Sequence, residues 1–120
     1  MLLDNDSARL RHMLEASKDA LMFSAGRCRQ DLDRDRQLVF ALVRALEIVG
    51  EAAARLSDEF RRAHPELPVH KMVAARNRLI HAYFDVNLDI VWQTVAEELP
   101  QLVRMLELLP EIKQDDTPIL

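Results

Sequence analysis

The sequence predicts an all-α protein, and three observations support that prediction. Only two glycines occur in 120 residues, and the strong helix formers Ala, Leu, Glu and Arg are spread along the chain. No stretch alternates apolar and polar residues over the length of a strand, and no Asn-Gly or Asp-Gly hairpin signal is present. Apolar residues recur instead at helical spacing in four segments, which favours an antiparallel four-helix bundle.

The first predicted helix begins with Asp6 or Ser7 as its N-cap and ends at Gly26, a residue type that often follows a helix. Its apolar face consists of Leu10, Met13, Leu14, Ser17, Ala20, Leu21 and Ser24. The charged stretch 27–36 then forms a loop with a short turn around residues 31–33.

The second predicted helix is long and ends near His64, because Pro65 disfavours helical geometry in the residue before it. One face of this helix carries Val39, Leu42, Leu46, Val49, Ala53, Leu56 and Phe60. Residues 65–68 form a tight linker to the third helix.

The third predicted helix begins near Val69 and runs through Ile80, or as far as Phe84. Residues 85–87 break the chain, and Asn87 suits the N-cap of a fourth helix. Pro100 lies inside that fourth helix and predicts a kink or a restart near it. Residues 1–109 are expected to form one helical domain, followed by a flexible C-terminal tail over 110–120.

The composition limits the possible functions. An apolar fraction of 49% and a charged fraction of 30% are typical of one globular domain and exclude general disorder. A single cysteine excludes an internal disulfide and a Cys-based zinc site, and no metal or cofactor motif is present. With no signal segment and no long apolar run, we expect a cytoplasmic protein without a membrane span. A net charge of −4 argues against a protein that coats nucleic acid.

The third helix concentrates the residues capable of chemistry: Arg76, Asn77, Arg78, His81 and Tyr83. At about 100° per residue, Arg76 and Tyr83 fall on the apolar side of the helix, whereas Asn77 and His81 fall roughly opposite. A histidine near neutral pH can accept the proton of a ribose 2′-OH, and an arginine can stabilise the charge on the attacked phosphate. The pattern therefore permits metal-free RNA cleavage, but the spacing alone favours an exposed or packed helix histidine over a catalytic one.

Arg76 on the apolar side needs a partner, because a buried guanidinium is costly unless it is paired. Glu47 in the second helix is the preferred candidate. The alternative is that Arg76 buries only its stem and reaches solvent at the edge of the bundle.

The segment 76–83, RNRLIHAY, resembles the R-x-x-x-x-H-x-Y motif of HepT-like toxins in the HEPN superfamily. The segments LEIVGEAA (46–53), the stretch from Val86 to Trp92, and LPQL (99–102) resemble other parts of the same family in the same order. The similarity covers about residues 11–106. Ala75 and Arg78 depart from the family's usual residues without removing any motif position.

This resemblance implies a dimeric helical bundle that acts as a metal-independent endoribonuclease toxin. It implies that Arg76 and His81 are the catalytic pair and that Asn77 orients His81 or a phosphate. Arg78, which departs from the family, is expected to line a solvated face, with an additional phosphate contact as the alternative. The resemblance also implies that a cognate MntA-type nucleotidyltransferase antitoxin silences the toxin by transferring AMP to Tyr83. The cleft forms either within one chain, through helix distortion or a wrapped Arg76 side chain, or between two chains.

Two other readings remain beside the nuclease. In the first, the chain is a non-catalytic helical adaptor that binds a minimal nucleotidyltransferase and its nucleotide or substrate. In the second, it is a structural dimer with a vestigial site. A nuclease reading is compatible with the acidic chain only if positive charge is focused around Arg76 and Arg78.

Overall fold

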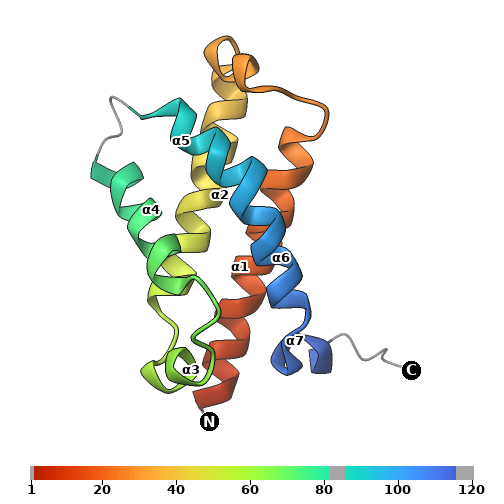
Figure 1. The fold of residues 1–120 in the computed structure, drawn as a ribbon, viewed down its shortest axis with the longest axis vertical. Coiled ribbons are helices and arrows are strands. Elements are labelled where there is room, and N and C mark those ends of the chain that lie inside the picture. Colours follow the sequence, from red (N-terminus) through yellow and green to blue (C-terminus); the bar gives the residue numbers. More distant parts are fainter. Residues whose placement is uncertain (1, 82–85, 116–120) are drawn as a thin grey trace.

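The computed structural model describes residues 2–81 and 86–115, which are helical with short connections and contain no strand. Figure 1 shows the order of the elements along the chain. They are α1 (Leu2–Ser24), the 3-10 turn η1 (Arg29–Asp33), α2 (Arg36–Ala54), α3 (Asp58–Ala63), α4 (Val69–His81), α5 (Leu88–Gln93), the π-helical turn η2 (Thr94–Glu98), α6 (Leu99–Glu107) and α7 (Pro110–Asp115).

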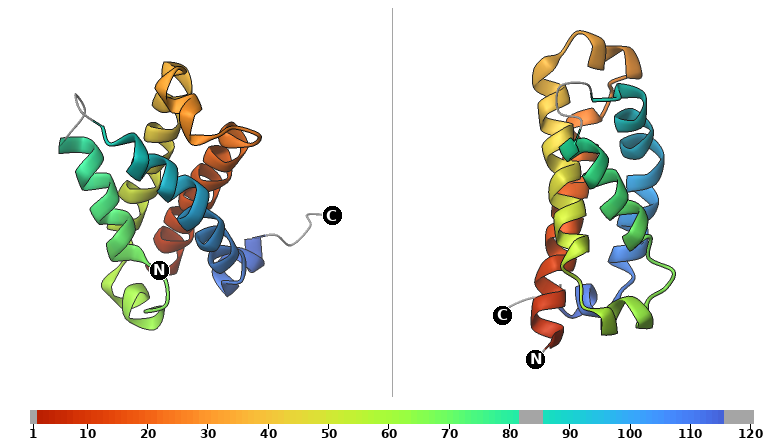
Figure 2. Two further views of the ribbon diagram at one scale, coloured as in Figure 1. Left: turned by 45° about the horizontal axis from the view of Figure 1, so that its top comes forward. Right: turned by 90° about the vertical axis from the view of Figure 1, so that its left-hand side faces the viewer.

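Four long segments run up, down, up and down, which confirms the predicted all-α class and is compatible with the bundle (Figure 1). The antiparallel pair α1 and α2 forms one layer, and α4 and the segment α5–η2–α6 lie on one face of it (Figure 2, right). The largest completely buried apolar side chains come from all of these segments except α4: Leu10, Met13, Leu42, Val49, Val91, Val95, Leu99, Leu102 and Leu106. Among the described residues, no helix is long and apolar enough to cross a membrane.

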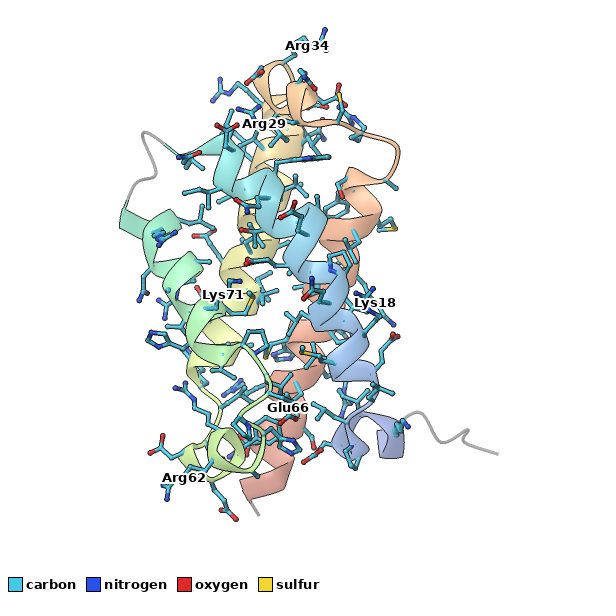
Figure 3. The ribbon with its side chains drawn as sticks, viewed as in Figure 1. Lys18, Arg29, Arg34, Arg62, Glu66 and Lys71 are labelled. Atoms are coloured by element: carbon cyan, nitrogen blue, oxygen red, sulfur yellow. The ribbon has the colours of Figure 1, made fainter. Side chains whose placement is uncertain are left out.

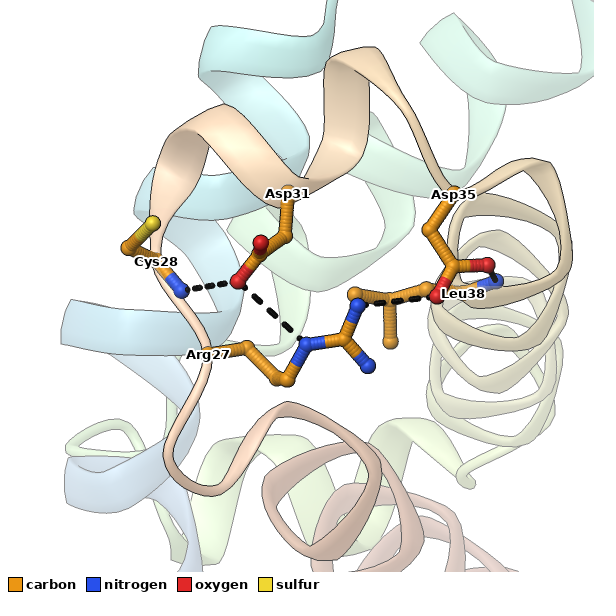
Figure 4. Close-up of polar contacts among 5 residues, drawn as sticks. All are labelled: Arg27, Cys28, Asp31, Asp35 and Leu38. Carbon is orange, nitrogen blue, oxygen red and sulfur yellow. Dashed lines mark hydrogen bonds and ion pairs between the residues drawn. The ribbon is translucent and has the colours of Figure 1, made fainter.

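The connection between α1 and α2 is fixed by Arg27. Gly26 takes a positive φ of 72°, which ends α1 as the sequence predicts. Arg27 then binds Asp31 (Nε–Oδ2, 3.3 Å) and Asp35 (Nη2–Oδ2, 2.8 Å), as Figure 4 shows. Asp35 caps α2 by accepting the backbone N–H of Leu38 at 3.0 Å.

These contacts stabilise the ionised carboxylates. The pKa of Asp31 is lowered chiefly by the backbone N–H of Cys28, and the Arg27 guanidinium adds to the effect. The pKa of Asp35 is lowered chiefly by Arg27. The predicted turn around residues 31–33 is therefore present, and its charges are paired rather than merely solvated.

The start of α1 and the end of α2 differ from the predictions, and Asp6 explains much of the difference. α1 begins at Leu2, so Asp6 lies inside the helix, 3% exposed, rather than at its N-cap. Its carboxylate accepts hydrogen bonds from the backbone N–H and the hydroxyl of Ser57, at 2.9 and 2.6 Å. Ser57 in turn caps α3 by accepting the N–H of Phe60. The predicted continuous second helix is thus divided at Ala54, and α3 starts as a separate element.

The break before the fourth segment is confirmed, with Asn87 accepting the N–H groups of Asp89 and Ile90. The discontinuity predicted near Pro100 takes the form of η2, in which the N–H of Leu99 bonds to the carbonyl of Thr94. Pro100 lacks an N–H and occupies the first turn of α6, where none is needed.

The chain beyond residue 109 begins with a short helix. Residues 110–115 form α7, and Ile112 is only 3% exposed. Leu109, next to this helix, is also buried. Apolar packing of α7 therefore orders the first part of the segment that its polar and proline-containing composition predicts to be frayed.

Candidate functional site

The candidate site centres on α4, which is a regular α-helix over all 13 residues from Val69 to His81. Met72 and Leu79 on its apolar side are buried, at 2% and 7% exposure, as the helical wheel predicts. His70 and Asn77 on the other side are exposed. The helix contains three Lys or Arg residues and no Asp or Glu, so it is strongly cationic within an acidic chain.

Arg76 crosses α2 at Gly50. A Cβ atom placed on Gly50 would lie 2.1 Å from Cβ and 2.7 Å from Cγ of Arg76, and 3.0 Å from the carbonyl oxygen of Met72. Only a residue without a side chain allows this approach of two helices. Gly50 therefore fixes where the Arg76 stem lies.

The guanidinium of Arg76 carries an unused hydrogen-bond donor. Its Nε is buried and has no partner among the described residues. A buried donor without an acceptor is costly, so its presence requires an explanation. The Nε of Arg61 is also buried without a partner in the described part of the chain, so this feature is not confined to the candidate site.

The ion pair predicted between Arg76 and Glu47 is not formed among the residues that the structure describes. Arg76 meets α2 at Gly50, about one turn further along the helix than Glu47. Glu51, the other acid of this stretch, lines a small hollow between α1 and α2 together with Arg9 and His12. Arg76 as a whole is half-buried, and its Nε atom is buried.

The remaining predicted residues lie at the C-terminal end of α4. Arg78 is exposed, and so is Asn77. His81 is the last residue of the helix, and Tyr83 lies outside the described residues. Because α4 is uninterrupted, the backbone positions of Arg76 and His81 point about 140° apart. Distortion of the helix up to His81 therefore does not bring them together.

A groove separates α4 from α5 and η2, and sequence reasoning missed it. Its volume is about 310 Å³, and Lys71, Ala74, Ala75, Arg78, Ile90, Gln93, Thr94 and Glu98 line it. Lys71 and Glu98 form an ion pair across it, and Lys71 can be located on α4 in Figure 3. A smaller apolar hollow of about 80 Å³ adjoins the groove and shares Ala75, Arg78, Ile90 and Thr94 with it.

The sequence contained a signal for the close contact at Gly50, but not for the groove. One of only two glycines lies inside a predicted helix, and an isolated helical glycine often marks a close packing contact. The groove residues gave no such signal, because they come from two segments far apart in the sequence. No three His, Cys, Asp or Glu side chains lie together as a metal site within residues 2–81 and 86–115.

Comparison with known proteins relates this chain to one family. The sequence profile of the family described as "Ribonuclease HepT-like" matches residues 13–109. A protein of Thermococcus cleftensis named "Probable ribonuclease HepT" is 41% identical over 93 residues, which are 78% of this chain and 84% of that protein.

Further relatives carry the name "Putative RNase", among them one from Caldanaerobacter subterraneus and one from Methanocaldococcus jannaschii. The one from Caldanaerobacter subterraneus is 37% identical over 98 residues, or 82% of this chain and 88% of the relative. The one from Methanocaldococcus jannaschii is 32% identical over 102 residues, or 85% and 94%. No solved structure matches the chain significantly.

Proposed function

Because the chain belongs to the ribonuclease HepT-like family, we propose that it is a metal-independent endoribonuclease with Arg76 and His81 as its catalytic pair. His81 accepts the proton of a ribose 2′-OH, and the 2′-oxygen attacks the adjacent phosphorus. Arg76 stabilises the negative charge that develops on the phosphate oxygens. The bond from phosphorus to the 5′-oxygen breaks, the 5′-oxygen takes up a proton, and the products are a 2′,3′-cyclic phosphate and a 5′-hydroxyl.

The observation that supports this proposal best is the cationic helix α4, which carries Arg76 and Arg78 and contains no Asp or Glu. Arginine binds phosphate in a bidentate manner that lysine cannot reproduce. Asn77 and Arg78 are exposed beside Arg76 and can add phosphate contacts. A net charge of −4 argues against a broad nucleic-acid-binding surface, but a local concentration of positive charge on α4 is compatible with binding RNA at one site.

The test is cleavage of a defined RNA in the presence of EDTA, with identification of the ends. We expect 2′,3′-cyclic phosphate ends from the wild type and no cleavage by Arg76→Ala or His81→Ala. Arg76→Lys keeps the charge but loses the planar fork, so we expect at least a tenfold lower rate. Intact RNA with saturating wild-type protein would reject the nuclease and favour a non-catalytic adaptor.

We further propose that the cleft combines Arg76 of one chain with His81 of a second chain in a homodimer. The regular α4 helix supports this, because it directs the two positions about 140° apart within one chain. A mixture of Arg76→Ala and His81→Ala proteins tests it, since a mixed dimer would then contain one intact site. About a quarter of wild-type activity is expected after random exchange of equal amounts. No activity in mixed dimers would place both residues in one chain's cleft.

As a toxin, the protein would be neutralised by a nucleotidyltransferase partner that transfers AMP to Tyr83. We expect its expression alone to arrest growth and His81→Ala to remove the effect. Co-expression with the partner should add the mass of one AMP to the wild type. Tyr83→Phe should still cleave RNA but escape neutralisation. Neutralisation of Tyr83→Phe by the partner would show that Tyr83 is not the modified residue.

A further inference from the structure

We propose that the groove between α4 and α5–η2 holds one base of the RNA substrate, next to the phosphate that is cut. The inference rests on the proposed nuclease function and deepens it by assigning a position for base recognition. It concerns residues outside the R-x-x-x-x-H-x-Y motif, chiefly Ala74, Gln93 and Glu98.

The groove has the size and surface of a small-ligand site. A volume of about 310 Å³ lies at the lower end of the range for such sites and exceeds what a single base requires. Ala74 and Ala75 leave space on the α4 side because their side chains are short, and Ile90 supplies an apolar surface on the other side. A flat base can therefore enter between the two helices.

The polar groups around this space suit the edge of a base. Gln93 offers an amide that both donates and accepts hydrogen bonds, and Glu98 offers carboxylate oxygens that accept from exocyclic amino groups. The ion pair with Lys71 offsets the negative charge of Glu98, so the groove does not repel the RNA backbone. Thr94 donates its hydroxyl to the carbonyl of Ile90 at 2.7 Å and keeps its methyl group for packing.

The groove also lies on the appropriate side of α4. Lys71, Ala74 and Arg78 line it, and they follow one another at three and four residues along one side of the helix. The backbone position of His81 comes three residues after Arg78 and continues that side, whereas Arg76 points toward Gly50 of α2. A strand with its phosphate near the end of α4 can thus place the adjoining base in the groove, with Arg78 at the phosphate.

The experiment measures base preference at the positions that flank the cut, in a random-sequence RNA pool sequenced after partial cleavage. We expect the wild type to prefer one base at one flanking position by about tenfold. This is the scale of a single good contact between a side chain and a base. Gln93→Ala, which removes the amide, and Ala74→Leu, which narrows the groove, should each reduce that preference at least fivefold. The matched controls Gln101→Ala and Ala63→Leu change exposed residues outside the groove and should leave it unchanged.

A second measurement reads occupancy of the groove without cleavage. An RNA with 2′-O-methyl groups at every position is titrated into the protein, and methyl resonances of Ala74, Ala75 and Thr94 are followed by NMR. We expect saturable shifts at these methyl groups in the wild type, no shift at Ala75 and Thr94 in the Ala74→Leu variant, and no shift at Ala63. Thermal unfolding of each variant verifies that it remains folded.

The outcomes separate the two proposals. A wild type that cuts RNA with no flanking preference, or with a preference unchanged in Gln93→Ala and Ala74→Leu, overturns the base site and leaves the nuclease intact. A wild type that does not cut RNA overturns the nuclease, and the methyl shifts then decide the base site alone. Absence of those shifts overturns the base site in either case.

Discussion

Replacing Gly50 by alanine adds a single methyl group at the crossing of α2 and α4. That methyl would lie 2.1 Å from Cβ of Arg76 and 2.7 Å from its Cγ. Carbon atoms in contact are about 3.5 Å apart, so the two helices must separate by roughly 1.4 Å. Since the Cβ of Arg76 is fixed to the backbone, rotation of its side chain cannot relieve the overlap.

The cost follows from two opposing effects. Forcing extra carbon into a packed helix interface destabilises a protein by about 1–3 kcal/mol. Alanine is more favourable than glycine inside a helix by about 1 kcal/mol. Because both overlapping groups are attached to backbone, we take the upper end of the first range and expect a net loss of about 2 kcal/mol. For a chain of this size that corresponds to a fall of about 8 °C in Tm.

The assay is equilibrium unfolding in urea followed by circular dichroism, with RNA cleavage measured on the same protein below its unfolding range. We expect a lower urea midpoint with an unchanged slope, and a kcat/KM lower by about 100-fold because Arg76 is displaced by more than 1 Å. Gly26→Ala is the matched control. Gly26 has a φ of 72° and no neighbouring atom within 4 Å, so its replacement costs only backbone strain, about 1 kcal/mol, without loss of cleavage.

Two results would refute the reasoning in different places. If Gly50→Ala unfolds at the same or a higher urea concentration than the wild type, the close approach of α2 and α4 does not constrain the fold. If it is destabilised yet cleaves RNA at the wild-type rate, the crossing does not position the Arg76 guanidinium for catalysis.

Three further predictions concern stability. Asp6→Ala should lower the free energy of unfolding in urea by about 2–3 kcal/mol, because it removes two hydrogen bonds to Ser57. The control Asp19→Ala, at an exposed residue, should lower it by less than about 0.5 kcal/mol. Equal losses would contradict the role of Asp6. Ile112→Ala should cost about 2–4 kcal/mol, since the side chain is buried, and no loss would mean that α7 does not pack. The lowered pKa of Asp35 stabilises the fold fully above the ordinary value of 3.8, and this stabilisation is lost as pH falls through the lower folded-state pKa. The urea midpoint of Asp35→Asn should therefore fall less than that of the wild type between pH 5 and pH 2, and identical falls would reject this assignment.

Most of the fold followed from local signals in the sequence. Gly26, Asn87 and Pro100 each mark an element boundary through a property of the residue itself: positive φ, a capping amide and a missing N–H. These properties act over one helical turn, so they are visible in the sequence. The division of the second helix at Ala54 was not predictable in this way, because the group that holds Ser57 is Asp6, 51 residues earlier.

The buried and exposed faces of α4 were predictable from the sequence, but the surroundings of Arg76 were not. The helical wheel correctly placed Met72 and Leu79 on the buried side of α4 and Asn77 on the exposed side. The preference for Glu47 as partner of Arg76 failed because charge complementarity does not say at which turn two helices cross. That point is decided by backbone contact at Gly50, a property of the assembled pair of helices.

The π-helical turn η2 gives the last long segment a register that a regular helix would not have. The buried residues Val91, Val95 and Leu99 of this segment follow one another at intervals of four residues. In a regular α-helix, four residues advance about 40° beyond a full turn. The bond from Leu99 to Thr94 accommodates one additional residue in the turn, as a single-residue insertion would. Deleting Ala96 would restore a continuous α-helix and rotate α5 by about 100°, carrying Ile90 away from α4. The length of this segment is thus constrained as strictly as its composition, and one lost residue would reshape the groove without altering any side chain that lines it.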